Sequence, residues 1–293
     1  MNGLRKWDDL APRVLSGAAM AAVGLGLLWA GGVWFAALAV LAAALMIWEL
    51  AVMTGQGVPG QGVPGQGVPG RGVPGQGVPG RGVPGRGAEA KVLAGIAAVA
   101  LALALYMQHP FYMPLLALPC LAGSLSSGRR NRLDYAVYSA MIMLASYGLV
   151  AFREGYGTLW LLWLVLVVVV TDIAGYFAGR VIGGPKFWPA ISPKKTWSGT
   201  VAGWIAAALI GWAFLAFTTA GRDLVWISGL LAFFSQMGDI FESSVKRRAG
   251  VKDSSHLIPG HGGLMDRFDG LLGAALFMLF VAVVLPVPVP IVR

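Results

Sequence analysis

Charged side chains are scarce in this chain, and their scarcity excludes most soluble folds. Only 12% of its 293 residues are charged and 57% are apolar, whereas soluble domains have about 25% charged and 45–50% apolar residues. The apolar residues gather in runs of roughly 20, the length that crosses a hydrocarbon core of about 30 Å. The composition therefore indicates a polytopic membrane protein.

Cysteine is almost absent as well. Cys120 is the single thiol, and it lies within an apolar run. One cysteine cannot form an intramolecular disulfide, and no base stands beside it that would support thiol catalysis. Packing is the expected role of Cys120.

Nine apolar runs are long enough to cross a membrane. They show no alternation of period two, and backbone groups in lipid must be bonded within a segment, so helices are favoured over a barrel. The expected fold is all-α, and Pro114 and Pro119 make the fourth run the weakest, a kinked or re-entrant helix. The runs lie at about 13–30, 32–53, 90–107, 111–127, 133–152, 158–182, 198–219, 224–245 and 268–286.

The positive charges predict an orientation. The net charge of +9 would suggest nucleic acid for a soluble chain, but membrane proteins concentrate Lys and Arg in cytoplasmic loops. With nine spans, 19 of the 22 basic residues fall on the side of the N-terminus, leaving Arg153, Arg222 and Arg293 on the other. We expect a cytoplasmic N-terminus and no nucleic-acid partner.

A repeat separates the first two spans from the rest. Residues 57–86 are six tandem pentapeptides, GVPGQ or GVPGR. Pro-Gly every five residues favours successive turns, and the segment has no larger apolar side chain to bury. An insert tolerated in a surface loop is the simplest interpretation; a basic tether to anionic lipid through Arg71, Arg81 and Arg86 is the alternative.

These features divide the chain into four regions. Residues 1–54 hold two helices, 55–87 the repeat linker, 88–170 the middle helices and 171–293 nearly all ionisable residues at membrane depth. Because such residues are costly in lipid, the last region is expected to be the functional one.

Two ionisable positions inside apolar runs have competing interpretations. Glu49 follows Trp48 near the end of the second run and is either an interfacial anchor or functional. Asp172 lies well inside the sixth run, and helical spacing places it on one face with Tyr176 and Arg180. This face is either a functional polar stripe or a structural Asp–Arg pair.

The segment 183–200, GGPKFWPAISPKKTWSGT, combines glycine, proline and lysine. Its glycines and prolines forbid a simple helix, while Lys186, Lys194 and Lys195 supply ammonium groups that bind phosphates. Cytoplasmic orientation alone would also explain basic residues here, although not their mixture with so much proline and glycine.

Carboxylates occur at the ends of the last two apolar runs. Asp239 and Glu242 are spaced i, i+3 and share a helical face, as do Asp266 and Asp269. Between them lies a basic loop with His261 in an HGG turn. Carboxylates from two helix ends suit Mg²⁺, which takes one or two protein carboxylates and completes its shell with water and phosphate oxygens. Metal and cations are the parts that phosphoryl or nucleotidyl transfer requires; a solvated helix end is the alternative.

The residues from Ser243 to Asp269, SSVKRRAGVKDSSHLIPGHGGLMDRFD, resemble the signature of the phosphatidate cytidylyltransferases, or CDP-diacylglycerol synthases. TDIAGYFAGRVIGG, ISPKKTWSGT and SQMGD resemble the blocks that precede it. The resemblance covers about residues 171–200 and 235–270, and the pentapeptide insert lies outside it.

The resemblance implies transfer of a cytidylyl group from CTP to phosphatidic acid, with Mg²⁺ and possible K⁺ as cofactors. It also implies a multi-pass, homodimeric enzyme of the inner membrane, surrounded by lipids and with its active site facing the cytoplasm. The metal ligands are expected to be Asp239 and Asp266, with Lys252, Asp253 and His261 as further catalytic or positioning residues. Substrate contacts are expected from Asp172, Arg180, Lys194, Lys195, Ser243, Lys246, Arg247, Gly262, Gly263, Arg267 and Asp269.

Two other function classes are compatible with a polar site in a helical membrane protein. A CTP-dependent polyprenol or phytol kinase would transfer the γ-phosphoryl group and release CDP. An anion transporter would carry inverted-repeat symmetry and broken helices in both halves. The polar residues here are confined almost entirely to the C-terminal region, which disfavours the transporter.

Overall fold

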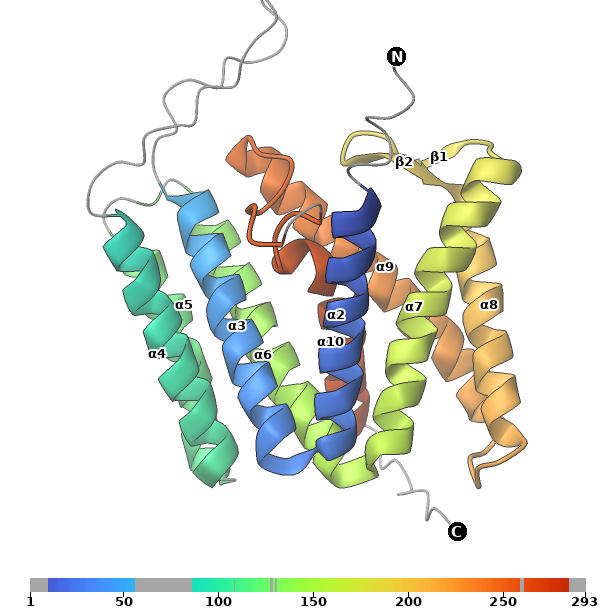
Figure 1. Ribbon diagram of the computed structural model, residues 1–293, viewed down its shortest axis with the longest axis horizontal. Helices are drawn as coiled ribbons and strands as arrows, with labels where there is room; N and C mark the ends of the chain where they lie inside the picture. The colour runs from blue at the N-terminus through green and yellow to red at the C-terminus, as the bar shows by residue number, and fades with distance from the viewer. Residues whose placement is uncertain are drawn as a thin grey trace, which may run out of the picture.

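The computed structural model describes residues 10–55, 86–107, 109–126, 129, 131–258 and 261–284, apart from the side chains of 10–14, 86 and 284. Within these ranges the regular elements are helices and one short hairpin, joined by loops (Figure 1). The elements are α2 (Leu10–Ala30), α3 (Gly32–Thr54), α4 (Arg86–Met107), η1 (Pro110–Ala117), α5 (Leu118–Leu125), α6 (Arg132–Tyr156), α7 (Thr158–Val181), β1 (Lys186–Trp188), β2 (Ser192–Thr196), α8 (Trp197–Leu215), α9 (Asp223–Ala249) and α10 (Met265–Val284).

The helical prediction is confirmed, since every predicted run overlaps a helix. In the described part of the chain, 6 helices are long and apolar enough to cross a membrane: α3, α4, α6, α7, α8 and α9. The predicted interruption of the fourth run is also confirmed. A 3₁₀ helix with Pro114 inside it, η1, is followed by the short helix α5, because proline removes a donor and clashes with the preceding turn of an α-helix.

A β-hairpin is the element that the all-α prediction missed. β1 and β2 pair antiparallel, with Lys186 opposite Thr196 and Trp188 opposite Ser192. The turn-forming residues between the two strands disfavour a helix in this segment between α7 and α8. Thr196 then caps α8 by accepting a hydrogen bond from Gly199 N. The hairpin is thereby joined rigidly to α8, and Lys195 on β2 has a defined position.

Two apolar clusters hold the helices together. One joins α3, α4, α6, α9 and α10 around buried side chains such as Met46, Tyr138 and Leu272. The other joins α3, α6, α7, α8, α9 and α10 around residues such as Trp163 and Leu231. α3, α6, α9 and α10 all contribute to both clusters, so the N-terminal and C-terminal helices form one bundle.

The polar segments gather at one end of this bundle. Figure 1 shows the β1–β2 hairpin, the loop between α9 and α10 and the C-terminal end of α3 at the same end. The turns that follow α2, α6 and α8 lie at the opposite end. Segments far apart in the sequence can therefore contribute to one site.

Arg129 fixes the two helix ends that flank the repeat. Its buried guanidinium donates to Thr54 Oγ1 at the end of α3 (2.5 Å) and pairs with Glu89 Oε1 in the first turn of α4 (2.9 Å). It also lies 3.9 Å from the centre of the Tyr135 ring. Most of the repeat, residues 57–85, lies outside the described residues, but its two attachment points are held together without it.

Deletion of residues 57–86 should therefore change the rate of cytidylyl transfer, the activity that the sequence resemblance implies, by no more than about twofold. The reason is that the free energy of closing a surface loop depends only weakly on the length of the loop. The measurement is turnover per inserted protein, with the melting temperature in detergent as the control for folding. A loss of many-fold in a well-inserted deletion variant would show that the repeat has a role of its own.

Candidate functional site

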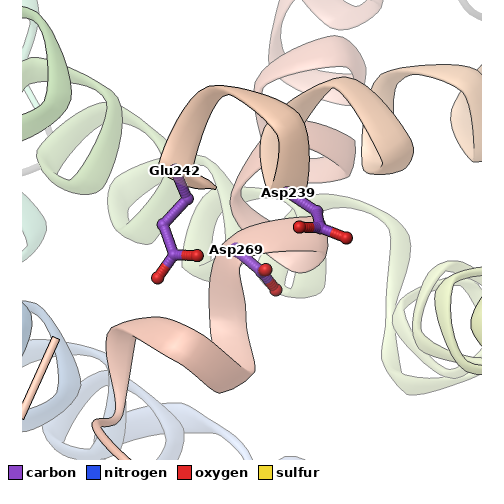
Figure 2. A group of neighbouring side chains, drawn as sticks. All are labelled: Asp239, Glu242 and Asp269. Atoms are coloured by element: carbon purple, nitrogen blue, oxygen red, sulfur yellow. The ribbon is translucent and has the colours of Figure 1, made fainter. Parts of the chain in front are cut away.

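Three carboxylates from two helices converge near the polar end of the bundle. Asp239 and Glu242 lie on α9 and Asp269 lies on α10, and Figure 2 shows Asp269 between the other two side chains. One oxygen from each lies within 4.8 Å of the others. Glu242 is buried and the other two are half-buried. Such a group can hold a cation, and the helical spacing of Asp239 and Glu242 had indicated two of its three members.

Close contact between α9 and α10 brings these carboxylates together. A Cβ at Gly238 would overlap the backbone oxygen of Asp269, and a Cβ at Gly273 would overlap the backbone oxygen of Phe234. Glycine at both positions allows the two backbones to approach this closely. Asp239 on α9 and Asp269 on α10 lie beside these close backbone contacts, and their carboxylates are consequently near one another.

Two lysines balance part of the negative charge. Lys195 Nζ of the hairpin lies 2.5 Å from Asp239 Oδ2, and Lys246 Nζ lies 2.6 Å from Glu242 Oε2. Ser243 Oγ donates to Asp239 Oδ1 at 3.3 Å. The segment predicted to bind phosphate is thus joined to the predicted carboxylate pair by the Lys195–Asp239 ion pair.

Asp266 lies outside this cluster and is connected to it through Lys246. Its Oδ1 accepts from Lys246 Nζ at 2.6 Å, and its Oδ2 accepts from Gly263 N at 2.8 Å and Ser254 N at 3.0 Å. Both oxygens therefore already have donors within the protein. The pairing of Asp239 with Asp266 as metal ligands stays a prediction, and Asp269 is the α10 carboxylate beside Asp239.

His261 contacts the N-terminal helix. Its Nδ1 lies 2.8 Å from Ser16 Oγ on α2, and its backbone oxygen accepts from Arg267 Nη2 at 2.6 Å. Gly262 follows with φ +86°, in the left-handed region that favours glycine. His261, Gly262 and Arg267 thus shape the loop, and none of them belongs to the carboxylate cluster.

Glu49 is the functional-site neighbour whose role sequence reasoning did not identify. It is fully buried on α3, so the interpretation as an interfacial anchor is wrong. Its carboxylate accepts hydrogen bonds from Leu264 N and Met265 N, both at 2.8 Å. The one available signal was its place as an ionisable residue in an apolar run.

The Asp172 stripe on α7 is formed only in part. Arg180 Nη1 donates to Tyr176 Oη at 2.8 Å, as the helical spacing predicts. Asp172, however, forms no ion pair with Arg180 among the described residues, so the alternative of a structural Asp–Arg pair is wrong. Lys194 is exposed beside Lys195.

A polar cavity of about 530 Å³ opens where α9 ends and the loop begins. Lys252 and Asp253 are exposed there. Three of the lining residues carry nitrogen atoms that can meet an anion. The lining is Arg247, Gly250, Val251, Lys252, Asp253 and His256.

The chain is similar to known nucleotidyltransferases. The model of the family described as "Cytidylyltransferase family" matches residues 11–285. A phosphatidate cytidylyltransferase of Brucella suis is 46% identical over 162 residues, 54% of this chain and 58% of the relative. One from Staphylococcus haemolyticus is 36% identical over 151 residues, 49% of this chain and 58% of the relative. The aligned region thus spans little more than half the length of these relatives.

The carboxylate cluster predicts which residues bind a divalent cation. Asp269→Asn should weaken Mn²⁺ binding at least about 100-fold, because it removes a charge from the cluster. Asp266→Asn should weaken it about tenfold, because Asp266 acts on the cluster through Lys246. Electron paramagnetic resonance of free Mn²⁺ measures both values.

Asp223→Asn, at the opposite end of α9, is the matched control and should bind Mn²⁺ as the unaltered protein does. Equal losses for Asp266→Asn and Asp269→Asn would instead favour Asp266 as a ligand. Unchanged binding in Asp269→Asn would contradict the cluster.

Proposed function

This chain belongs to the cytidylyltransferase family, and we propose that it transfers a cytidylyl group from CTP to phosphatidate, forming CDP-diacylglycerol and pyrophosphate. The observation that carries the proposal is the cluster of three carboxylates with Lys195 and Lys246 at the polar end of an apolar bundle. A soluble nucleotide and a lipid phosphate would meet at such a boundary.

The reaction asks for positioning and charge neutralisation more than for proton transfer. A phosphate oxygen of phosphatidate attacks the α-phosphorus of CTP in line, the new O–P bond forms, and the bond to the β-phosphate bridging oxygen breaks. Pyrophosphate leaves with the electron pair. Because a phosphate monoester is already anionic at neutral pH, no strong general base is needed.

The basic residues divide between the two substrates in this proposal. Lys195 and Lys194 on β2 would bind phosphate oxygens at the cluster, since Lys195 already lies beside Asp239. Arg247 and Lys252 line the polar cavity and would bind the triphosphate of CTP. Lys246 would hold the carboxylates of Glu242 and Asp266 in their relative positions. Asp253 and His261 would position the loop.

The residues present fit a divalent cation. Three converging carboxylates are unfavourable unless a cation neutralises them, and hard oxygen ligands suit Mg²⁺. We propose Asp239, Glu242 and Asp269 as the residues that hold it, with Asp266 as the alternative α10 ligand. When bound, Mg²⁺ would stabilise charge that develops on the phosphate oxygens. K⁺ as a second cation rests on the resemblance alone.

We further propose nine membrane spans with a cytoplasmic N-terminus, in the inner membrane. The gathering of the hairpin, the α9–α10 loop and the end of α3 at one end of the bundle supports a single cytoplasmic site (Figure 1). The excess of Lys and Arg predicted for that side supports the same orientation. Assembly as a homodimer remains a prediction from the resemblance.

Purified protein incubated with phosphatidate, Mg²⁺ and CTP labelled at the α-phosphate should yield labelled CDP-diacylglycerol and unlabelled pyrophosphate. Asp239→Asn should reduce turnover at least about 100-fold while the protein remains inserted. Release of CDP with a phosphorylated lipid would instead identify a lipid kinase. Absence of any turnover by the intact protein would contradict the proposal and favour anion transport.

A further inference from the structure

The loop between α9 and α10 is folded around a carboxylate from the opposite half of the chain. Glu49 lies near the end of α3, more than 200 residues before its partners, and is fully buried. Figure 1 shows the end of α3 beside this loop. The family-like sequence blocks all lie after residue 170, so nothing in them indicates this contribution.

Each oxygen of Glu49 accepts two hydrogen bonds from the loop. Oε1 accepts from Ser255 Oγ at 2.6 Å and Leu264 N at 2.8 Å. Oε2 accepts from Met265 N at 2.8 Å and Ser254 Oγ at 3.2 Å. Two of these donors are backbone groups at the start of α10, where a helix leaves N–H groups without internal partners and favours a negative charge.

The carboxylate is enclosed as well as bonded. A Cβ at Gly263 would lie 2.6 Å from Glu49 Oε1 and would overlap Ser254 Oγ. Glycine at this position therefore lets the loop backbone close directly over Glu49. Glu49 forms no ion pair within the described part of the chain, so its four hydrogen bonds to the loop are what compensate its burial.

Ser254 connects Glu49 to the catalytic groups. Its Oγ lies 3.2 Å from Glu49 Oε2 and 3.1 Å from Asp266 Oδ2, so its single proton is shared between the two carboxylates. Asp266 holds Lys246 at 2.6 Å, and Lys246 holds Glu242 of the carboxylate cluster at 2.6 Å. A continuous chain of polar contacts thus runs from α3 to the proposed metal site.

We propose that Glu49 is a positioning residue for the nucleotidyl transfer: its buried carboxylate fixes the loop and the start of α10, and thereby the geometry of Asp266, Lys246 and the carboxylate cluster. This inference rests on the proposed function for its activity readout but not for its metal readout. Glu49 acts through these residues and touches neither substrate. Helix α3 then supports the catalytic site and is more than a membrane anchor.

Glu49→Gln is the sharpest variant because it keeps the shape of the side chain. Whichever oxygen becomes the amide nitrogen, it faces a backbone N–H of Leu264 or Met265, which can only donate. One hydrogen bond from a backbone N–H to Glu49 is lost, and that N–H then faces the N–H₂ group of the new amide. Glu89→Gln is the matched control: it makes the same change in the N-terminal half, at a residue that pairs with Arg129 and not with the loop.

Turnover and Mn²⁺ affinity are measured on folded, monodisperse protein of each variant. Glu49→Gln should lower kcat about tenfold or more and weaken Mn²⁺ binding about tenfold, the effect expected from residues that orient metal ligands. Glu89→Gln should change the melting temperature but neither of these quantities per folded molecule. A purely structural role for Glu49 predicts the same pattern for both variants.

Unaltered kcat and Mn²⁺ affinity in folded Glu49→Gln overturn the proposal, as do equal losses in Glu89→Gln. If Glu49→Gln does not fold, Ser255→Ala decides, since it removes the 2.6 Å bond to Oε1 and, besides that, one exposed bond from Leu257 N within the loop: a loss of about threefold in kcat and Mn²⁺ affinity supports the proposal, and no loss overturns it. If the unaltered protein makes no CDP-diacylglycerol but Glu49→Gln still weakens Mn²⁺ binding, the proposed function fails and the positioning role stands.

Discussion

The cost of ionising Asp239, Glu242 and Asp269 side by side is the constraint on which the rest of the site depends. Two like charges about 4 Å apart repel by about 4 kcal/mol at the effective dielectric of a protein boundary, and these three lie within 4.8 Å of one another. Lys195 and Lys246 offset part of that cost. Each lysine is in turn held by another element: the first by the hairpin before α8, the second by Asp266 and the loop.

This constraint explains why the site needs the whole bundle. Gly238 and Gly273 allow α9 and α10 to pack closely, and this packing brings the three carboxylates together. The hairpin reaches it from α7 and α8, and α3 supports the loop through Glu49. An apolar interior favours such an arrangement, because charges that are not paired or bound to a cation are expensive there. The same cost favours the binding of a cation at the cluster.

Much of the architecture follows from the sequence, because hydrophobic length alone specifies helices in a membrane protein. All nine predicted runs became helices, and the prolines at 114 and 119 broke the fourth one. Local spacing also identified Asp239 with Glu242 and the lysine-rich loop. The hairpin was missed because its strands are short and one of them contains a proline. Glu49 and Asp269 could not be assigned to their roles, since their partners depend on contacts between helices that no periodicity reports.

The position of a bound cation tests the account most directly. Protein prepared with Mn²⁺ and examined by anomalous X-ray scattering should show one peak at about 2.1 Å from carboxylate oxygens of Asp239 and Asp269, with Glu242 beside it and Lys195 moved from Asp239. A peak bound by Asp266 with Asp269 out of reach, or the absence of any peak near α9, would contradict the central role of the three carboxylates.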